Sequence, residues 1–414
     1  MRLLLTALTC LFIFIHNQTY TQEIKKYVLS HTSVINSISI ADTNYSDLKV
    51  FADGIGNSKI VLLGEQDHGD APAFLAKTRL IKFLHEKMGF EVLAFESDFY
   101  SLTKSWEAFK DGTQTIQQVT ANIFPIWTHC DACQDLFTYI NYTQNSSTPL
   151  AVTGFDSQIH GNYRMTHYKD DFLKQLNSVN APEKFFTQLD RLLSLVETHY
   201  PLDKSTNIAT DSLVYWNTIL DSLIEWNSKL PGNSYLTILT KSLKAYVQQG
   251  KFSNEKNYEA LTVRDRQMAA NLKWISDYYY PGKKIIVWAH NYHVAKNTWE
   301  AMGPKAGRHL SMGHFLFQDF KNQMYILGFT SYEGTAGRIF FKPYKVASPK
   351  KNSIESWFAK KNSEYAFIDF RNYKTTKPEL FYMKGKFHRN AEARWNEVFD
   401  GVFYIRKMYP CMKM

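Results

Sequence analysis

Five acidic and basic side chains follow apolar runs that have the character of buried strands: Glu65, His68, Glu96, His290 and His293. Ligands of open α/β sheets bind just beyond the carboxyl ends of the strands, so we expect these side chains to share one crevice. Histidine, with an unperturbed pKa of about 6.5, can take a proton from water near neutral pH. A carboxylate beside it fixes its tautomer and favours the imidazolium that forms. These residue types therefore indicate a hydrolase that activates water.

The elements that must position these side chains are buried strands and the helices between them. Apolar runs predict strands at residues 60–63, 92–95, 151–155, 285–288, 325–329, 338–341, 367–370 and 402–405. Several are continuous apolar runs, which suit strands covered on both faces of a parallel sheet. Residues 73–87 carry apolar side chains at helical spacing and end at Gly89, which predicts a strand–helix–strand unit. The expected fold class is α/β, with a mostly parallel sheet flanked by helices.

The middle of the chain has a different pattern. Residues 163–260 show long helical periods with no convincing strand. We interpret them as a large helical insertion over the C-terminal ends of the strands, which divides the α/β catalytic core into residues 22–162 and 261–414. The alternative is that these helices are oversized crossover helices of the same domain.

The start of the chain predicts export. Met1 and Arg2 precede an apolar run over residues 3–15. A charged start followed by about thirteen apolar residues is typical of a signal peptide and is short for a membrane span. We therefore expect residues 1–21 to be a signal peptide and the mature chain to be periplasmic or secreted, with no stable membrane span. The alternative is an uncleaved N-terminal anchor.

The composition limits the class of protein to which the chain can belong. The chain has 414 residues, of which 44% are hydrophobic and 15% aromatic, enough for a large core. The formal net charge is +9, but the basic residues are scattered and form no basic helix with interleaved aromatics. We therefore expect a folded globular protein that binds no nucleic acid. The sequence leaves the oligomeric state open.

The cysteines offer little chemistry of their own. Cys130, Cys133 and Cys411 remain after cleavage. An oxidising compartment favours a Cys130–Cys133 disulfide and leaves Cys411 inert, whereas a lone C-x-x-C is weak evidence for zinc. The sequence has no Gly-x-Ser-x-Gly elbow and no cysteine with a histidine context beyond His129, so water is the better nucleophile.

A series of short motifs resembles the erythromycin esterase family in order and spacing, from about residue 45 to residue 405. The motifs are Gly64–Gly69, the following helix with Lys77 and Arg79, Gly89–Phe90, Ala94–Glu96, Gly154–Asp156, Arg264–Met268, Trp288–His293 and Met312–His314. The resemblance implies hydrolysis of a macrolactone ester by water, with no covalent enzyme intermediate. It thereby associates the chain with macrolides and with the response to antibiotics.

The resemblance also implies roles for individual residues. Glu65 and His68 match the family's essential Glu and His, Glu96 its strand-end glutamate, and His290 with His293 its late histidine pair. We expect His68 to be the general base, with Glu65 or Glu96 orienting it. His290, His293 or Lys77 would stabilise the oxyanion or protonate the leaving alkoxide.

Five further residues are predicted to bind the substrate, a small-molecule ester or lactone: Lys77, Arg79, Asp156, Arg264 and Asn291. Lys77 stands where many relatives carry arginine, and lysine lacks the bidentate fork. Arg264 can instead form an internal ion pair with its neighbour Asp265, which would hold the helical part to the sheet.

No cofactor is predicted, and two alternatives use the same residues differently. Two glutamates and three histidines could hold a divalent ion, which would make the protein a metal-dependent hydrolase. A non-catalytic protein that binds haem, a metal or a glycan is the second alternative.

Overall fold

The computed structural model describes residues 23–201, 208–230, 235–251, 258–297, 309–374 and 379–414. The predicted signal peptide, residues 1–21, lies outside the described residues. Within them, no helix is both long enough and apolar enough to cross a membrane.

A nine-stranded sheet forms the centre of the molecule, in the order β1-β8-β11-β6-β2-β5-β3-β4, with β7 paired to β6. The strands from β11 to β4 along this order run parallel, and β8 is antiparallel to both of its neighbours. The bounds are β1 (Ser33–Ile35), β2 (Ile60–Leu63), β3 (Phe90–Asp98), β4 (Ala151–Asp156), β5 (Lys284–Trp288), β6 (Met324–Ala336), β7 (Tyr344–Lys345), β8 (Tyr365–Asp369) and β11 (Gly401–Met408). A separate antiparallel hairpin consists of β9 (Phe381–Lys386) and β10 (Arg389–Ala393). The predicted α/β class with a mostly parallel sheet is confirmed.

The predicted strands are confirmed except for residues 338–341. The chain turns there, and the Phe341 N–H donates to the Arg338 carbonyl over 2.9 Å. β6 stops just before, where Gly337 has a φ of 151°, a conformation that glycine adopts readily. Phe340 and Phe341 are 50% and 70% exposed. Their apolar character therefore does not mark a buried strand.

Helices cover both faces of the sheet, and a hydrophobic cluster lies under each layer. The helices of the core are α2 (Lys49–Ile55), α3 (Ala71–Met88), α4 (Phe99–Lys110), α5 (Ile116–Thr120), α6 (Pro125–Thr128), α7 (Gln134–Thr143), α12 (Tyr258–Trp274), α13 (Asn291–Val294), α15 (Met312–Phe320), α16 (Ile354–Phe358) and α17 (Trp395–Val398). α3 is the helix predicted between the first two core strands, and Gly89 ends it in a left-handed conformation with a φ of 69°.

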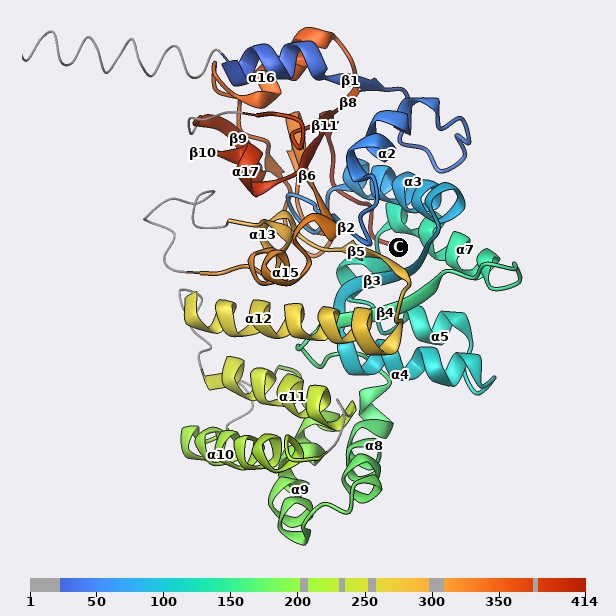
Figure 1. Cartoon of the computed structure of the whole chain (residues 1–414), viewed down its shortest axis with the longest axis vertical. Helices are drawn as coiled ribbons and strands as arrows, with labels where there is room; N and C mark the ends of the chain where they lie inside the picture. The colour runs from blue at the N-terminus through green and yellow to red at the C-terminus, as the bar shows by residue number, and fades with distance from the viewer. Residues whose placement is uncertain (1–22, 202–207, 231–234, 252–257, 298–308, 375–378) are drawn as a thin grey trace, which may run out of the picture.

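Residues 163–260 are helical where they are described. They contain α8 (Arg164–Ser178), α9 (Glu183–Thr198), α10 (Thr210–Asn227), α11 (Tyr235–Lys251) and the start of α12, and α8–α11 share a hydrophobic cluster of their own. Figure 1 shows this stack beyond the β4 edge of the sheet, with α12 between the stack and the strands. It reaches the strand ends at their margin, where Gln249 Nε2 donates to Ser157 Oγ over 3.0 Å. The division of the chain into domains stays an interpretation.

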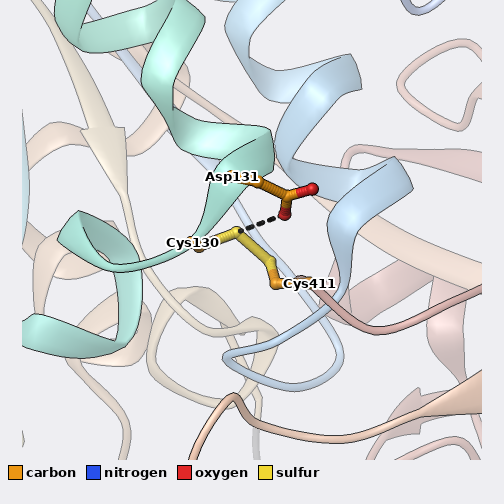
Figure 2. Close-up of side chains that lie close together, drawn as sticks. All are labelled: Cys130, Asp131 and Cys411. Carbon is orange, nitrogen blue, oxygen red and sulfur yellow. Dashed lines mark hydrogen bonds between the residues drawn. A yellow bond between two sulfur atoms is a disulfide. The ribbon is translucent and has the colours of Figure 1, made fainter. Parts of the chain in front are cut away.

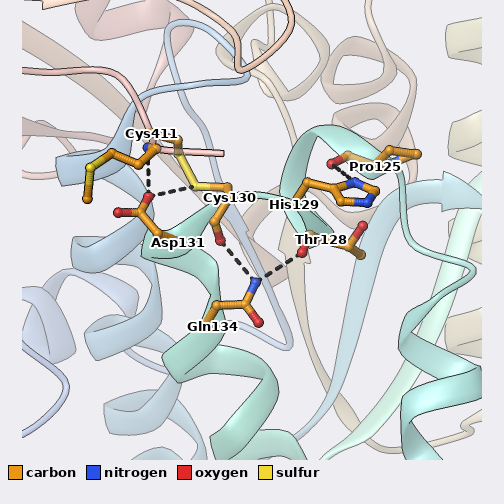
Figure 3. Close-up of a disulfide and its surroundings, with 8 residues drawn as sticks. Pro125, Thr128, His129, Cys130, Asp131, Gln134 and Cys411 are labelled. Carbon is orange, nitrogen blue, oxygen red and sulfur yellow. Dashed lines mark hydrogen bonds between the residues drawn. A yellow bond between two sulfur atoms is a disulfide. The ribbon is translucent and has the colours of Figure 1, made fainter. Parts of the chain in front are cut away.

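The disulfide differs from the one predicted. Cys130 is bonded to Cys411, with Asp131 beside them, and Cys133 is a buried free thiol (Figure 2). The reason is the path of the C-terminal segment, which forms a β-bridge between Lys413 and Cys130. Gln134 Nε2 supports the same loop by donating to the Cys130 carbonyl over 3.1 Å (Figure 3). Cys411 is therefore a structural residue and not an inert one.

Candidate active site

The loop that follows β2 carries a buried unit of three charged side chains. Glu65 and Lys77 have fully buried side chains, and one Glu65 oxygen pairs with Lys77 Nζ. The other oxygen lies 2.8 Å from His68 Nδ1. The loop can approach its neighbour closely because it begins with glycine: a Cβ on Gly64 would lie 2.1 Å from Asn291 Oδ1. The loop after β2 therefore supplies both Glu65 and His68, and α3 supplies the Lys77 ammonium that pairs with Glu65.

Lys77 faces away from the crevice and serves Glu65. Its ammonium lies 3.8 Å from the centre of the Trp288 ring. Burial lowers the pKa of Lys77 below its usual range, and the Glu65 carboxylate opposes this effect. With a fully buried side chain, Lys77 cannot contact a substrate in this structure, so its predicted role in substrate binding is corrected.

His68 uses one of its ring nitrogens for a contact with the protein and leaves the other available to water. Its side chain is 13% exposed, and its ring meets the edge of Trp127 at 5.4 Å and lies 5.1 Å from the His290 ring. Nδ1 bonded to a carboxylate is the nitrogen that carries hydrogen, so Nε2 keeps a lone pair. Within the described part of the chain, Nε2 has no hydrogen-bond partner. The Glu65–His68 pair thus has the geometry of a general base with its orienting carboxylate.

A second charged group lies at the ends of β3 and β4. Arg264, from α12, donates through Nη2 to Glu96 over 3.0 Å and through Nε to Asp156 over 3.1 Å. The other Glu96 oxygen accepts the His290 backbone N–H over 2.9 Å. Burial would raise the pKa of Glu96, but the charges of His293, His68 and Arg264 lower it to about 2. Glu96 is therefore an ionised carboxylate that ties β3 to the loop after β5.

His293 is held between two carboxylates. Its Nδ1 lies 2.7 Å from Asp265 Oδ1, and its Nε2 lies 3.3 Å from Glu96 Oε1. Burial lowers the pKa of His293, but Asp265 and Glu96 outweigh it and raise that pKa. His309 bonds the other Asp265 oxygen over 3.0 Å. The sequence analysis placed Asp265 in an ion pair with its neighbour Arg264 and missed its pairing with His309. The one sequence feature that could have indicated this pairing is the position of His309, just before the motif that starts at Met312.

His290 has a positioning role because both of its ring nitrogens are used by the backbone. Nδ1 accepts the Tyr292 N–H over 3.0 Å, so Nε2 carries the hydrogen that it donates to the Gln66 carbonyl over 2.7 Å. Burial, followed by the nearby charges of His68 and His293, lowers the pKa of His290 well below its usual range. His290 is a neutral side chain that joins two strand-end loops, and proton transfer through it would break one of these bonds.

The other predicted substrate-binding residues are also held by the protein itself. Arg79 donates to Asp47 over 2.9 Å on the N-terminal segment, because residues two apart on a helix face different sides and Lys77 takes the side towards Glu65. Asn291 Nδ2 donates to the Phe329 carbonyl over 2.8 Å, and Asn291 Oδ1 accepts the Phe329 N–H. Asp156 and Arg264 bind each other. In this structure these four side chains bond to other parts of the protein, and their predicted role in substrate binding stays a prediction.

The donor atoms do not form a metal site. In the described ranges, the set of three potential ligand atoms within 4.8 Å of one another is Cys130, Asp131 and Cys411, and its two sulfur atoms are bonded together. The nitrogens of His290 and His293 already have protein partners. The residues present therefore do not fit the divalent ion of the metal-dependent alternative.

A hollow of about 220 Å³ opens beside Asp67, the residue that precedes His68. It is lined by Asp67, Gly337, Arg338, Phe341, Lys342, Tyr344 and Phe387. Its walls come from the loop after β6 and from the β9–β10 hairpin, whereas the sequence suggested a wall made by the helical insertion. A larger hollow, of about 520 Å³, lies among α10, α11 and α12. None of the five predicted catalytic residues lines either hollow.

The sheet and its strand-end acid–base residues define an α/β protein of hydrolase type, and comparison with known proteins agrees. The model of the erythromycin esterase family matches residues 233–408. The putative hydrolase YbfO of Bacillus subtilis is 26% identical, over 90% of this chain and 89% of that protein. Erythromycin esterase type II of Escherichia coli is 22% identical, over 88% of this chain and 93% of that protein.

A solved structure shares the fold. A mutant of the erythromycin esterase EreC, in its open conformation, superposes with a TM-score of 0.68 at 16% identity, over 92% of this chain and 98% of that one. These comparisons confirm the resemblance to the erythromycin esterase family that was found in the sequence.

Proposed function

We propose that this chain hydrolyses a carboxylic ester or lactone by direct attack of water, with His68 as the general base. The observation that carries the proposal is the 2.8 Å contact between Glu65 and His68 Nδ1, which leaves Nε2 open to a water molecule at the strand ends. His68 takes a proton from water as the oxygen attacks the carbonyl carbon. Glu65 then stabilises the imidazolium, and Lys77 pairs with the other Glu65 oxygen.

The proposed substrate is a bulky, neutral ester or lactone. Support comes from the hollow beside Asp67, the residue before His68, whose walls include Phe341, Tyr344 and Phe387. At about 25 cal/mol per Å² of apolar area, such walls favour an apolar arm of the substrate. The hollow is smaller than the roughly 300–1,000 Å³ of typical ligand sites, so it would take one part of a large substrate. A macrolide, the substrate class named by the Escherichia coli relative, is the instance to test for a role in the antibiotic response.

We also propose that the protein works outside the cytoplasm, as a periplasmic or secreted enzyme. The Cys130–Cys411 disulfide supports this location, because disulfides persist in oxidising compartments.

The test uses the purified mature protein after dialysis against a strong chelator, with metal loss confirmed by elemental analysis. Aryl esters, alkyl esters and erythromycin are assayed side by side, and we expect turnover that survives the chelator. His68→Asn should lower kcat by about 10²- to 10⁴-fold with an unchanged melting temperature. His31→Asn, at an exposed position, is the matched control and should keep full activity.

The outcomes separate the competing functions. Activity that vanishes with the chelator and returns with zinc would establish the metal-dependent hydrolase instead. An absence of turnover on every ester would favour the non-catalytic binding protein. Hydrolysis of aryl esters with erythromycin untouched would keep the esterase and remove the macrolide assignment.

A further inference from the structure

The β9–β10 hairpin, which the sequence analysis did not include in the site, is fixed firmly against the catalytic loop. Its turn consists of Phe387 and His388, with φ values of 49° and 53°. The Phe387 N–H donates to the Gln66 carbonyl over 3.0 Å. His388 is held between Ser331 Oγ, at 2.7 Å, and Asp70 Oδ1, at 2.9 Å. Ser331 is fully buried, so this Ser–His–Asp arrangement anchors the hairpin and offers no accessible nucleophile.

Lys386, the last residue of β9, is placed by this hairpin and has no carboxylate partner. Its ammonium lies 3.7 Å from the centre of the Tyr292 ring and 5.1 Å from that of Phe387. Within the described residues it makes no hydrogen bond and no ion pair. A desolvated cation over aromatic faces is held by cation–π attraction, which leaves all three of its N–H donors for a ligand.

The other cations around the crevice are already paired, apart from Lys342, which is exposed on the rim of the hollow. Arg264 binds Glu96 and Asp156, and Lys77 binds Glu65. The guanidinium on the rim of the hollow, Arg338, donates through Nε to Asp67 over 2.7 Å. Among the cations of this site that are at least partly buried in the described part of the chain, Lys386 is thus the one whose charge no acidic side chain neutralises.

Lys386 lies next to the strand-end residues, because its ammonium contacts the Tyr292 ring, whose centre lies 5.5 Å from that of the His293 ring. Its charge contributes to the lowered pKa of His290, whose ring lies 5.1 Å from that of His68. Burial lowers the pKa of Lys386 to about 8; the Asp265 carboxylate opposes this and the Arg338 charge adds to it. An ammonium with such a pKa is protonated at neutral pH and gives up its proton readily.

We propose that Lys386 is a catalytic residue that protonates the leaving alkoxide. This inference rests on the proposed ester hydrolysis and completes it, because none of the paired cations can serve as that acid. His68 takes a proton from water while the new C–O bond forms. When the bond to the alcohol oxygen breaks, Lys386 gives that oxygen a proton and becomes a neutral amine. Solvent then returns a proton to the amine and removes one from His68, so atoms and charges balance.

The test compares two esters of the same acid, a nitrophenyl ester and an ethyl ester. Nitrophenolate is stable as an anion and leaves unprotonated, whereas ethoxide needs a proton. Lys386→Met should lower kcat/KM for the ethyl ester by about 10²- to 10⁴-fold and change it less than about tenfold for the nitrophenyl ester. Lys386→Arg keeps the charge but holds its proton at neutral pH, and it should show the same selective loss. Lys345→Met, which removes an exposed lysine on β7, is the control and should leave both rates unchanged.

The possible results are distinct. An equal loss for both esters would show that Lys386 only supports the structure, and the inference would be wrong while the esterase stands. An ethyl-ester rate that survives in Lys386→Arg would assign the effect to charge alone and overturn the proton transfer. If the wild-type protein hydrolyses neither ester, the proposed function fails and the role of Lys386 fails with it. Lys386→Arg carries the test if Lys386→Met does not fold.

Discussion

Replacing Glu65 by glutamine removes one charge from the buried unit while keeping its size. Both Glu65 and Lys77 have no exposed side-chain surface, so the change leaves the Lys77 ammonium buried without its carboxylate. The acceptors that remain for it are neutral: the new amide oxygen and the Ala289 carbonyl, at 3.5 Å. Breaking one partner of a buried ion pair costs about 3–5 kcal/mol. Because domains are stable by only about 5–15 kcal/mol, Glu65→Gln should lose a large part of the free energy of unfolding.

A second substitution separates stability from catalysis. Lys77→Met, added to Glu65→Gln, removes the stranded charge and leaves a flexible apolar side chain to pack on Trp288. Replacing a whole buried ion pair by apolar groups is often neutral or stabilising by about 1–4 kcal/mol. The double variant should therefore recover most of the stability that Glu65→Gln loses.

Catalysis should not recover with stability. The glutamine amide can donate to His68 Nδ1, which moves the ring hydrogen to Nε2 and removes the lone pair that water needs. Both variants should therefore keep a kcat that is about 10²- to 10⁴-fold below the wild-type value. Urea unfolding measures the first quantity, and turnover of an aryl ester well below the unfolding midpoint measures the second.

The comparison can refute this reasoning in two ways. A double variant that regains activity together with stability would show that Glu65 only neutralises Lys77 and does not orient His68. A Glu65→Gln variant as stable as the wild-type protein would show that Lys77 loses its proton or finds another partner, and the buried ion pair would not support the fold.

Three further outcomes are expected. The low pKa of Glu96, about 2 against 4.5 for an ordinary glutamate, contributes stability above about pH 4.5 that is lost as the pH falls towards 2; the stability gap between the wild-type protein and Glu96→Gln should narrow over that range in urea titrations, and a constant gap would contradict the charged state. Cys411→Ser should lower the free energy of unfolding by about 2–5 kcal/mol, and a reductant should bring the wild-type protein to the same value and leave the variant unchanged. Mass spectrometry of the exported protein should find a chain that begins near Gln22, and an intact Met1 on most molecules would rule out cleavage.

The sequence was sufficient for features that depend on near neighbours in the chain. Buried parallel strands are continuous apolar runs, so β2, β3 and β5 could be found directly, and the residues that follow them had to emerge at one edge of the sheet. Glu65 and His68 are three residues apart in one loop, and their pairing needed no distant partner. The misassigned strand at residues 338–341 shows the limit, since an apolar run reports hydrophobicity and not burial.

The tertiary structure decided which of these groups are free to react. The rotation of α3 turns Lys77 towards Glu65, and this rotation depends on packing across the sheet. Asp265 and His293 meet across 28 residues of sequence, and Cys130 and Cys411 across 281. Lys386 reaches the crevice through a hairpin whose position depends on long-range hydrogen bonds. Contacts of this kind leave no periodic pattern in the sequence, because the two partners come together only when the chain has folded. The sequence therefore determined which chemical groups are present, and the fold determined which groups they contact.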